Sequence, residues 1–124
     1  MKQEKGRIIK LRECKPFTAG DRCRLREMLH AEKSGAAIRY SLAHATVRPG
    51  VTTLPHRMKT SEVYYILSGR GRMHINGLSK PVGPGDTVYI PPQARQCITS
   101  IGRRNLVFIC IVDPAWRAED EEII

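Results

Sequence analysis

The feature of this sequence that most constrains its fold is the spacing of turn signals from Tyr40 onward. Residue pairs that favour turns, such as Pro49-Gly50 and Asn76-Gly77, interrupt the chain about every 8–12 residues. Between them lie short segments rich in strand-favouring residues: SLAHATV, EVYYIL, RMHI, TVYI, CITSI and LVFICIV. This rhythm is typical of an all-β sandwich or barrel, and it argues against a doubly wound α/β fold, which needs long helices between strands.

The length and the hydropathy pattern restrict the class of protein further. A chain of 124 residues can bury the core of one domain without disulfides or a structural metal. No apolar run approaches the roughly 18 residues of a membrane-spanning helix. The N-terminal segment is charged and lacks the apolar stretch of a signal peptide. We therefore expect a cytoplasmic protein without a membrane partner.

Four side chains that could bind a metal ion or a ligand lie at spacings that would bring them together in a barrel. His56 and Met58 are two residues apart, so on a strand they point to the same face. Glu62 begins the next predicted strand after a short turn, and Gln96 belongs to a later strand. Side chains from three strands can therefore converge in one interior.

The residues around these positions form two motifs. The first reads Gly50-x5-His56-x-Met58-x3-Glu62-x6-Gly69, and the second reads Pro84-Gly85-Asp86 followed by Tyr89-Ile90-Pro91-Pro92 and Gln96. This pattern resembles the two motifs of the cupin superfamily, especially the small single-domain members labelled mannose-6-phosphate isomerase-like. The resemblance implies a cupin-type double-stranded β-helix, a jelly-roll barrel, over residues 40–114.

The resemblance also implies a metal site, from which this sequence departs twice. In the family these positions carry three His and one Glu, which bind a divalent metal. Here Met58 and Gln96 stand at two of the His positions, leaving His56, Glu62 and Gln96 as the ligands for one divalent ion of unknown identity. A neutral amide is a weak ligand, and a thioether suits soft ions. The alternative is that His56 and Glu62 hydrogen-bond each other, or a ligand, in a polar pocket.

Catalytic and ligand-binding roles follow from the same residues. His56 and Glu62 are the candidate catalytic pair, with Glu62 as the general base if burial raises its pKa. Strand alternation points Tyr64 inward together with Glu62 and turns Tyr65 outward. Tyr64, Met58 and Gln96 are the candidate ligand-binding residues.

The last two predicted strands can be read as a hairpin that turns at Arg103-Arg104. This register places Cys97 opposite Cys110, although in a cytosolic protein the four cysteines are expected to be free thiols. With Gln96 inward, it also predicts that Ile109 and Ile111 face the interior and that Phe108, Cys110 and Val112 face outward.

The two ends of the chain differ from the predicted barrel. We expect residues 1–39 to form an N-terminal arm that packs on the barrel. Thr18-Ala19-Gly20-Asp21 offers capping residues, and Leu25, Met28 and Leu29 recur at helical spacing, which predicts a short helix there. Residues 115–124 form an acidic C-terminal tail.

Three functions remain open. The first is a module that binds a small polar or anionic molecule, and the second is a metal-dependent cupin enzyme of the dioxygenase or isomerase type. The third is a basic protein that binds a polyanion, because about half of the net charge of +9 lies in the first 15 residues. No aromatic stacking motif accompanies this charge, so we do not expect nucleic acid. Apolar outward faces, including Val63, Tyr65 and Leu67, favour a homodimer.

Overall fold

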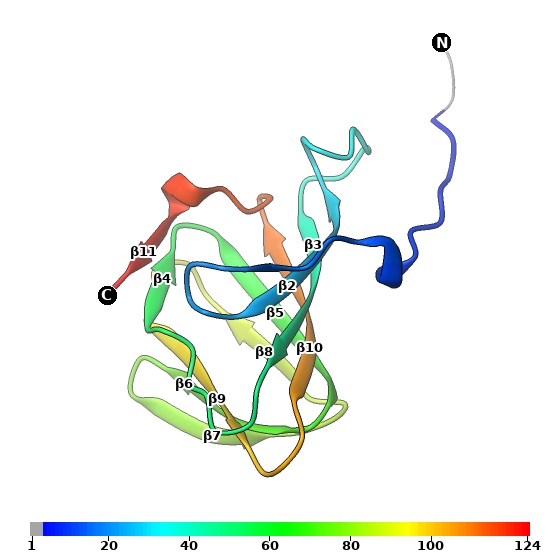
Figure 1. Cartoon of the computed structure of the whole chain (residues 1–124). Helices are drawn as coiled ribbons and strands as arrows, with labels where there is room; N and C mark the ends of the chain where they lie inside the picture. Colours follow the sequence, from blue (N-terminus) through cyan, green and yellow to red (C-terminus); the bar gives the residue numbers. More distant parts are fainter. Residues whose placement is uncertain (1–3) are drawn as a thin grey trace.

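Two antiparallel sheets packed face to face form a barrel in the computed structural model, which describes residues 4–124 (Figure 1). The six-stranded sheet contains, in spatial order, β1 (Phe17–Thr18), β2 (Arg24–His30), β3 (Ser41–Val47), β10 (Leu106–Asp113), β5 (Ser61–Ser68) and β8 (Thr87–Ile90). The five-stranded sheet contains β11 (Glu121–Ile123), β4 (His56–Met58), β9 (Gln96–Ile101), β6 (Arg70–Ile75) and β7 (Leu78–Val82). Two 3-10 turns, η1 (Leu11–Glu13) and η2 (Ala118–Asp120), lie near the chain ends. The expected all-β jelly-roll barrel is confirmed.

The six segments predicted as strands are β3, β5, β6, β8, β9 and β10. Their alternation follows the period of two that a half-buried strand requires. On β5, Glu62, Tyr64 and Ile66 are buried whereas Tyr65 is exposed, as the sequence predicts. On β9, Gln96, Ile98 and Ser100 are buried in the same way. None of the described helices is long and apolar enough to cross a membrane.

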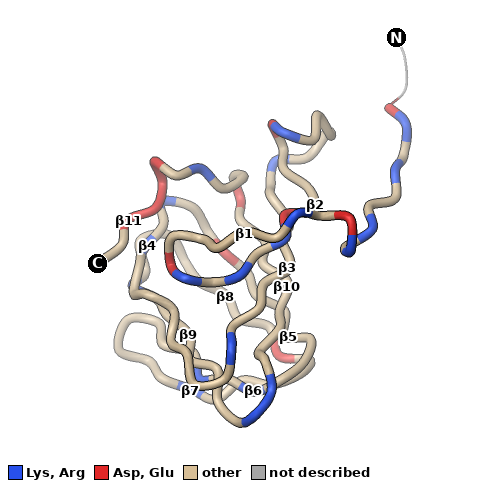
Figure 2. The backbone as a smooth tube through the Cα atoms, viewed as in Figure 1, with Lys and Arg blue, Asp and Glu red and all other residues tan. Residues whose placement is uncertain are grey.

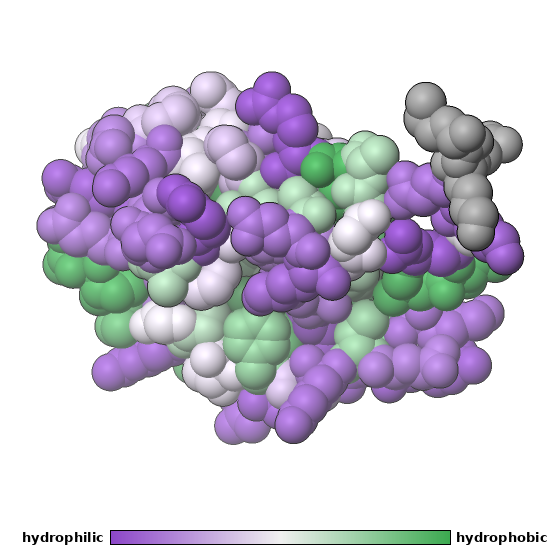
Figure 3. All heavy atoms as spheres, turned by 90° about the horizontal axis from the view of Figure 1, so that it is seen from above, coloured by the Kyte–Doolittle hydropathy of each residue, from purple (hydrophilic) through white to green (hydrophobic). Residues whose placement is uncertain are grey.

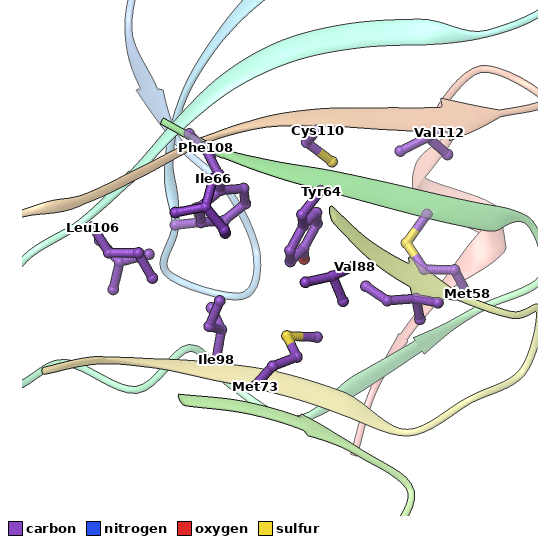
Figure 4. Close-up of a cluster of buried hydrophobic side chains, with 14 of the residues drawn as sticks. Met58, Tyr64, Ile66, Met73, Val88, Ile98, Leu106, Phe108, Cys110 and Val112 are labelled. Carbon is purple, nitrogen blue, oxygen red and sulfur yellow. The ribbon is translucent and has the colours of Figure 1, made fainter. Parts of the chain in front are cut away.

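The core fills the space between the two sheets. Figure 4 shows side chains of β5 and β10 pointing across the interior toward Met73 of β6 and Ile98 of β9. The Tyr64 and Phe108 rings lie with their centroids 4.3 Å apart. Such an aromatic pair adds a directional contact to the burial of apolar area. The core therefore holds Tyr64 in one orientation beside Glu62.

Gly69 marks the point at which the chain passes from one sheet to the other, between β5 and β6. Its φ of +79° lies in the left-handed region, where most residues with a Cβ are strained. A Cβ at this position would also collide with the carbonyl oxygen of Asn105. Only glycine satisfies both conditions, which explains its place in the first motif.

The predicted hairpin between β9 and β10 is wrong, because these strands lie in different sheets. β10 pairs with β3 and β5, so Cys110 lies opposite Ala43 and Tyr64. Cys97 lies opposite His74 on β6 instead. The four cysteines are free thiols.

The predicted orientation of β10 is also reversed. Phe108, Cys110 and Val112 are buried, whereas Ile109 and Ile111 lie on the outer face. The prediction carried the alternation of β9 through a tight turn. The chain between these strands instead crosses from one sheet to the other, and alternation is not transmitted across such a connection.

The predicted helix after Thr18-Ala19-Gly20-Asp21 is wrong as well. Residues 24–30 form β2, which pairs with β3 and with the two residues of β1. The register of β2 shifts between Glu27 and Leu29, so its side chains do not alternate with a period of two. This shift explains why the sequence looked helical. The helical turn of the arm lies earlier, at η1.

The acidic end of the chain is paired with the barrel. β11 pairs with β4, so that Ile123 lies opposite His56 and Glu122 lies opposite Arg57. The backbone N–H of Lys59 also donates to the carbonyl of Asp120 at 2.9 Å. The C-terminal segment therefore lies against β4, the strand that carries His56 and Met58.

The outer face of the six-stranded sheet carries an apolar patch, which we define as Val63, Tyr65, Leu67, Tyr89, Ile109 and Ile111. Tyr65, Leu67 and Tyr89 are all exposed, and Tyr89 retains 61% of its accessible surface. Cross-strand pairing joins these residues, because Tyr65 lies opposite Ile109 and Val63 lies opposite Tyr89. On the face drawn in Figure 3, hydrophilic side chains separate several hydrophobic areas.

Candidate functional site

A cavity of about 280 Å³ lies between the six-stranded sheet and the two chain ends. This volume lies just below the range of about 300–1,000 Å³ that is usual for small-molecule sites. Its inner wall is formed by residues of β3, β5 and β10: Ser41, Ala43, Ala45, Glu62, Tyr64, Phe108, Cys110 and Val112. Its outer wall comes from the arm, His56 and the C-terminal segment: residues 17–21, Cys23, Leu25, Glu27, His56, Trp116 and Glu121.

Glu62 is the central polar group of this cavity. Its Oε1 accepts a hydrogen bond from Nε2 of Gln96 at 2.8 Å, and its Oε2 accepts one from the Cys110 thiol at 2.8 Å. Burial raises the pKa of Glu62, and these two hydrogen bonds oppose the rise without cancelling it. Glu62 was predicted to be a candidate general base on the condition that burial raises its pKa, and the structure meets that condition.

Gln96 connects the two sheets through Glu62 and Tyr64. The Tyr64 hydroxyl donates to Oε1 of Gln96 at 3.0 Å, while Nε2 of the same amide bonds Glu62. Both ends of the amide are therefore engaged. Gln96 is buried behind Tyr64 and is not among the residues that line the cavity. Burial also raises the pKa of Tyr64 well above its ordinary value, so its hydroxyl keeps its proton.

His56 lies at the opposite side of the cavity with one nitrogen engaged. Its Nδ1 is 3.0 Å from the carbonyl of Leu54, and its Nε2 is 3.9 Å from Oδ2 of Asp21. A carbonyl only accepts hydrogen bonds, so Nδ1 carries a proton. Burial raises the pKa of Asp21, opposed by the hydrogen bond from the Cys23 backbone N–H and by the proximity of His56.

Met58 occupies a different environment from the other predicted site residues. It is 3% exposed and belongs to the hydrophobic core, where Figure 4 shows it near Val112. It does not line the cavity. The structure thus brings Glu62, Tyr64 and Gln96 into one hydrogen-bonded network, sets His56 across the cavity, and leaves Met58 in the apolar interior.

The donor set does not fit the divalent metal that the motifs imply. Over residues 4–124, no group of three or more His, Cys, Asp or Glu side chains is arranged to hold a metal ion. Both oxygens of Glu62 and both ends of the Gln96 amide are engaged with each other, Tyr64 and Cys110. A metal bound to His56, Glu62 and Gln96 would have to break these bonds and would gain only one neutral amide as its third ligand.

Sequence reasoning missed the residues that the chain ends supply. Asp21, Trp116 and Glu121 all line the cavity, and Nε1 of Trp116 donates to Oε2 of Glu121 at 2.9 Å. Cys110 was expected to face outward, yet its thiol bonds Glu62. The only signals were a turn-forming Asp and the single Trp of the chain, both of which have simpler explanations in a sequence.

Comparison with known proteins identifies the family. The family described as Cupin domain matches residues 43–112, which is more than half of the chain. The chain belongs to the cupin family. This match covers most of β3 through most of β10, so it contains the inner wall of the cavity except Ser41. Of the outer wall it contains only His56, and the chain ends supply the rest.

This cupin is similar to proteins of several kinds. It is 40% identical over 111 residues to the uncharacterized protein MJ1618 of Methanocaldococcus jannaschii, covering 89% of this chain and 88% of that protein. It is 30% identical over 71 residues to an oxalate-binding protein of Thermotoga maritima, covering 56% of this chain and 59% of that one. The structure of Pac13, a nucleoside dehydratase of Streptomyces, superposes with a TM-score of 0.77 at 20% identity, covering 97% and 92% of the two chains. This last likeness shows the fold alone.

The raised pKa of Glu62 predicts a pH-dependent contribution to stability. The pKa of Glu62 is higher in the folded protein than in the unfolded chain, where a Glu titrates at about 4.3. Its contribution to the free energy of unfolding is therefore complete below about pH 4.3 and is lost as the pH rises through the folded-state pKa. Relative to Glu62→Gln, the wild-type protein is therefore expected to lose unfolding free energy as pH rises from about 4.3 to neutral. Urea titrations at several pH values measure this difference.

The control is Glu122→Gln, which removes an exposed carboxyl on the neighbouring β11. A wild-type stability that rises with pH relative to Glu62→Gln would contradict the raised pKa of Glu62.

Proposed function

We propose that this cupin binds a small organic molecule in the cavity, with His56, Glu62 and Tyr64 orienting it. The observation that carries the proposal is the arrangement of these three side chains around one mainly apolar cavity. Sites for small molecules combine such walls with a few fixed polar groups. Gln96 serves this site indirectly, because it fixes the positions of Glu62 and Tyr64. A cytoplasmic location is part of the proposal.

The lining argues against a small dianion as the ligand. The protein of Thermotoga maritima named above binds oxalate by its name, yet the residues that line this cavity include no Lys or Arg. They include four acidic side chains: Asp21, Glu27, Glu62 and Glu121. An anion placed among them would meet unfavourable charge without a Lys or Arg side chain to compensate it. The anionic alternative considered for the binding module is therefore disfavoured.

The same residues can exchange protons with a bound molecule. Glu62 has a raised pKa, and His56 presents Nε2 toward Asp21 at the cavity wall. Titratable groups with perturbed pKa values in a cavity are candidates for general acid–base roles. We assign His56 and Glu62 these roles in any reaction that the bound molecule undergoes.

Filling the cavity is expected to abolish binding while the fold remains intact. Ala43 lies on β3 and faces the cavity, so Ala43→Leu would occupy the ligand volume. A compound at about 100 times its Kd should stabilise the wild-type protein by about 2.7 kcal/mol, which raises Tm by several degrees. Thermal unfolding against a compound collection measures this shift, which Ala43→Leu should eliminate.

Thr46→Leu is the matched control, because Thr46 lies on the opposite face of β3 and does not line the cavity. Compounds that stabilise the wild-type protein and Ala43→Leu equally would place binding elsewhere and contradict the proposal.

A metal-dependent cupin enzyme is the second candidate, favoured by family membership. We expect protein purified without an affinity tag to contain well under one metal per chain, because the donor set is occupied by its own hydrogen bonds. Elemental analysis measures this content. Gln96→His supplies a stronger ligand and is expected to retain more metal, which serves as the positive control.

One metal per wild-type chain, lost in His56→Ala, would overturn this expectation. That result would favour an enzyme that uses His56, Glu62 and Gln96 as metal ligands.

We also propose that this cupin forms a homodimer through the apolar patch on the six-stranded sheet. Large exposed apolar patches are unusual on monomers and mark interaction surfaces. Ile109→Glu places a charge in this patch and is expected to dissociate the dimer at micromolar concentration. Sedimentation velocity measures the oligomeric state.

Leu78→Glu is the matched control, because Leu78 is an exposed apolar residue on the other sheet. A wild-type protein that sediments as a monomer at micromolar concentration would contradict the dimer.

A further inference from the structure

The charge of the cavity is opposite to the charge of the chain. The sequence has a net charge of +9, yet the cavity is lined by four acidic side chains and by no Lys or Arg. Figure 2 shows the acidic segment before β11 and the acidic residue of the β1–β2 loop on the same side of the barrel. Lys33 pairs with Glu27 at 3.3 Å, and Lys33 is largely exposed. The other three carboxyl groups of the lining, those of Asp21, Glu62 and Glu121, have no Lys or Arg partner among the described ion pairs.

The polar groups that face the cavity accept hydrogen bonds. His56 is 2% exposed, and its Nδ1 proton is directed to the carbonyl of Leu54, so Nε2 is the ring nitrogen left to contact a ligand. This Nε2 lies 3.9 Å from Oδ2 of Asp21, which is beyond hydrogen-bond distance. The Tyr64 hydroxyl already donates a hydrogen bond to Gln96, so toward a ligand its oxygen can only accept.

The remaining polar atoms support the same conclusion. Nε1 of Trp116 already donates a hydrogen bond to Glu121, and the thiol of Cys110 already donates one to Glu62. The hydroxyls of Thr18 and Ser41 can donate or accept, so they set no preference. Both oxygens of Glu62 already accept hydrogen bonds, so Nε2 of His56 and Oδ2 of Asp21 are the atoms left to bond a ligand. A ligand that bonds the Asp21 carboxylate beside Glu62 must therefore bring N–H donors of its own.

The apolar part of the lining is aromatic. The chain has seven aromatic residues, and four of them line the cavity: Phe17, Tyr64, Phe108 and Trp116. The negative faces of aromatic rings attract organic cations, most strongly when the site excludes water. Aromatic walls with carboxylate and imidazole acceptors are the complement of a protonated amine attached to an apolar body.

On these grounds we infer that the ligand of the cavity is an organic cation, an ammonium or similar N–H-rich group carried on a small apolar body. This inference rests on the proposed binding function and names the class of molecule that the site selects. The ammonium group would lie between His56, Asp21 and Glu62, and the apolar body would lie against Phe17, Phe108 and Trp116.

Three probes of the same shape and different charge test this inference. Benzylamine, benzyl alcohol and benzoate are titrated into the full-length protein at about 0.15 M salt, which screens charges on the surface. Calorimetry and thermal unfolding measure their affinities. Benzylamine is expected to bind at least about tenfold more tightly than benzoate. The net positive charge of the chain would attract benzoate non-specifically, so this preference cannot arise from the overall field.

Two variants assign the effect to the cavity. Asp21→Asn keeps the size of the side chain. It is expected to weaken the binding of benzylamine about fivefold or more and to change the affinity for benzyl alcohol little. Ala43→Leu is expected to abolish binding of all probes. Thr46→Leu, on the outer face, is expected to bind as the wild-type protein does.

Each contrary outcome has a distinct meaning. Benzoate or benzyl alcohol binding as tightly as benzylamine, with loss in Ala43→Leu, would overturn the cationic class and leave the binding function standing. Benzylamine binding that survives in Ala43→Leu would also overturn the inference, because the cavity would not be its site. No binding of benzylamine at millimolar concentration would overturn it too, whereas the wider compound screen decides the binding function separately.

Discussion

The interior of this cupin depends on one buried carboxyl group that receives hydrogen bonds from both sheets. Glu62 and Cys110 lie in the six-stranded sheet, and Gln96 lies in the five-stranded sheet. A buried carboxyl is costly unless hydrogen bonds replace its hydration. Gln96 supplies one of these bonds and accepts another from Tyr64, so the amide stabilises both polar groups at once. The network therefore explains why Gln is compatible with a position where the resemblance to the cupin motifs implies His.

The barrel and the inner half of the site were predictable from the sequence because strong local signals encode them. Turn residues at regular spacing and alternating apolar residues predict the six main strands, and the motif spacing brings Glu62 and Gln96 together. Strand alternation also places Tyr64 beside Glu62 in the interior. The strands and the orientation of Tyr64 depend on neighbours within a few residues, so a single sequence carries them. The meeting of Glu62 with Gln96 joins the two sheets, and it was predictable only from the spacing of the two motifs.

The outer half of the site was not predictable, because it depends on long-range pairing. The shifted register of β2 hides its strand periodicity, and β11 has only three residues. The crossing of the chain between β9 and β10 reverses the expected orientation of Cys110. Nothing local to Asp21 or Trp116 indicates that these residues meet at one cavity.

The attachment of the C-terminal segment through backbone pairing has a further consequence. β11 is held against β4 by main-chain hydrogen bonds, which almost any sequence can form. The side chains of Trp116 and Glu121 that face the cavity are not required for those bonds. The outer wall can therefore diverge by substitution while the barrel and its carboxyl network persist. A scaffold organised in this way separates the residues under selection for stability from those under selection for ligand choice.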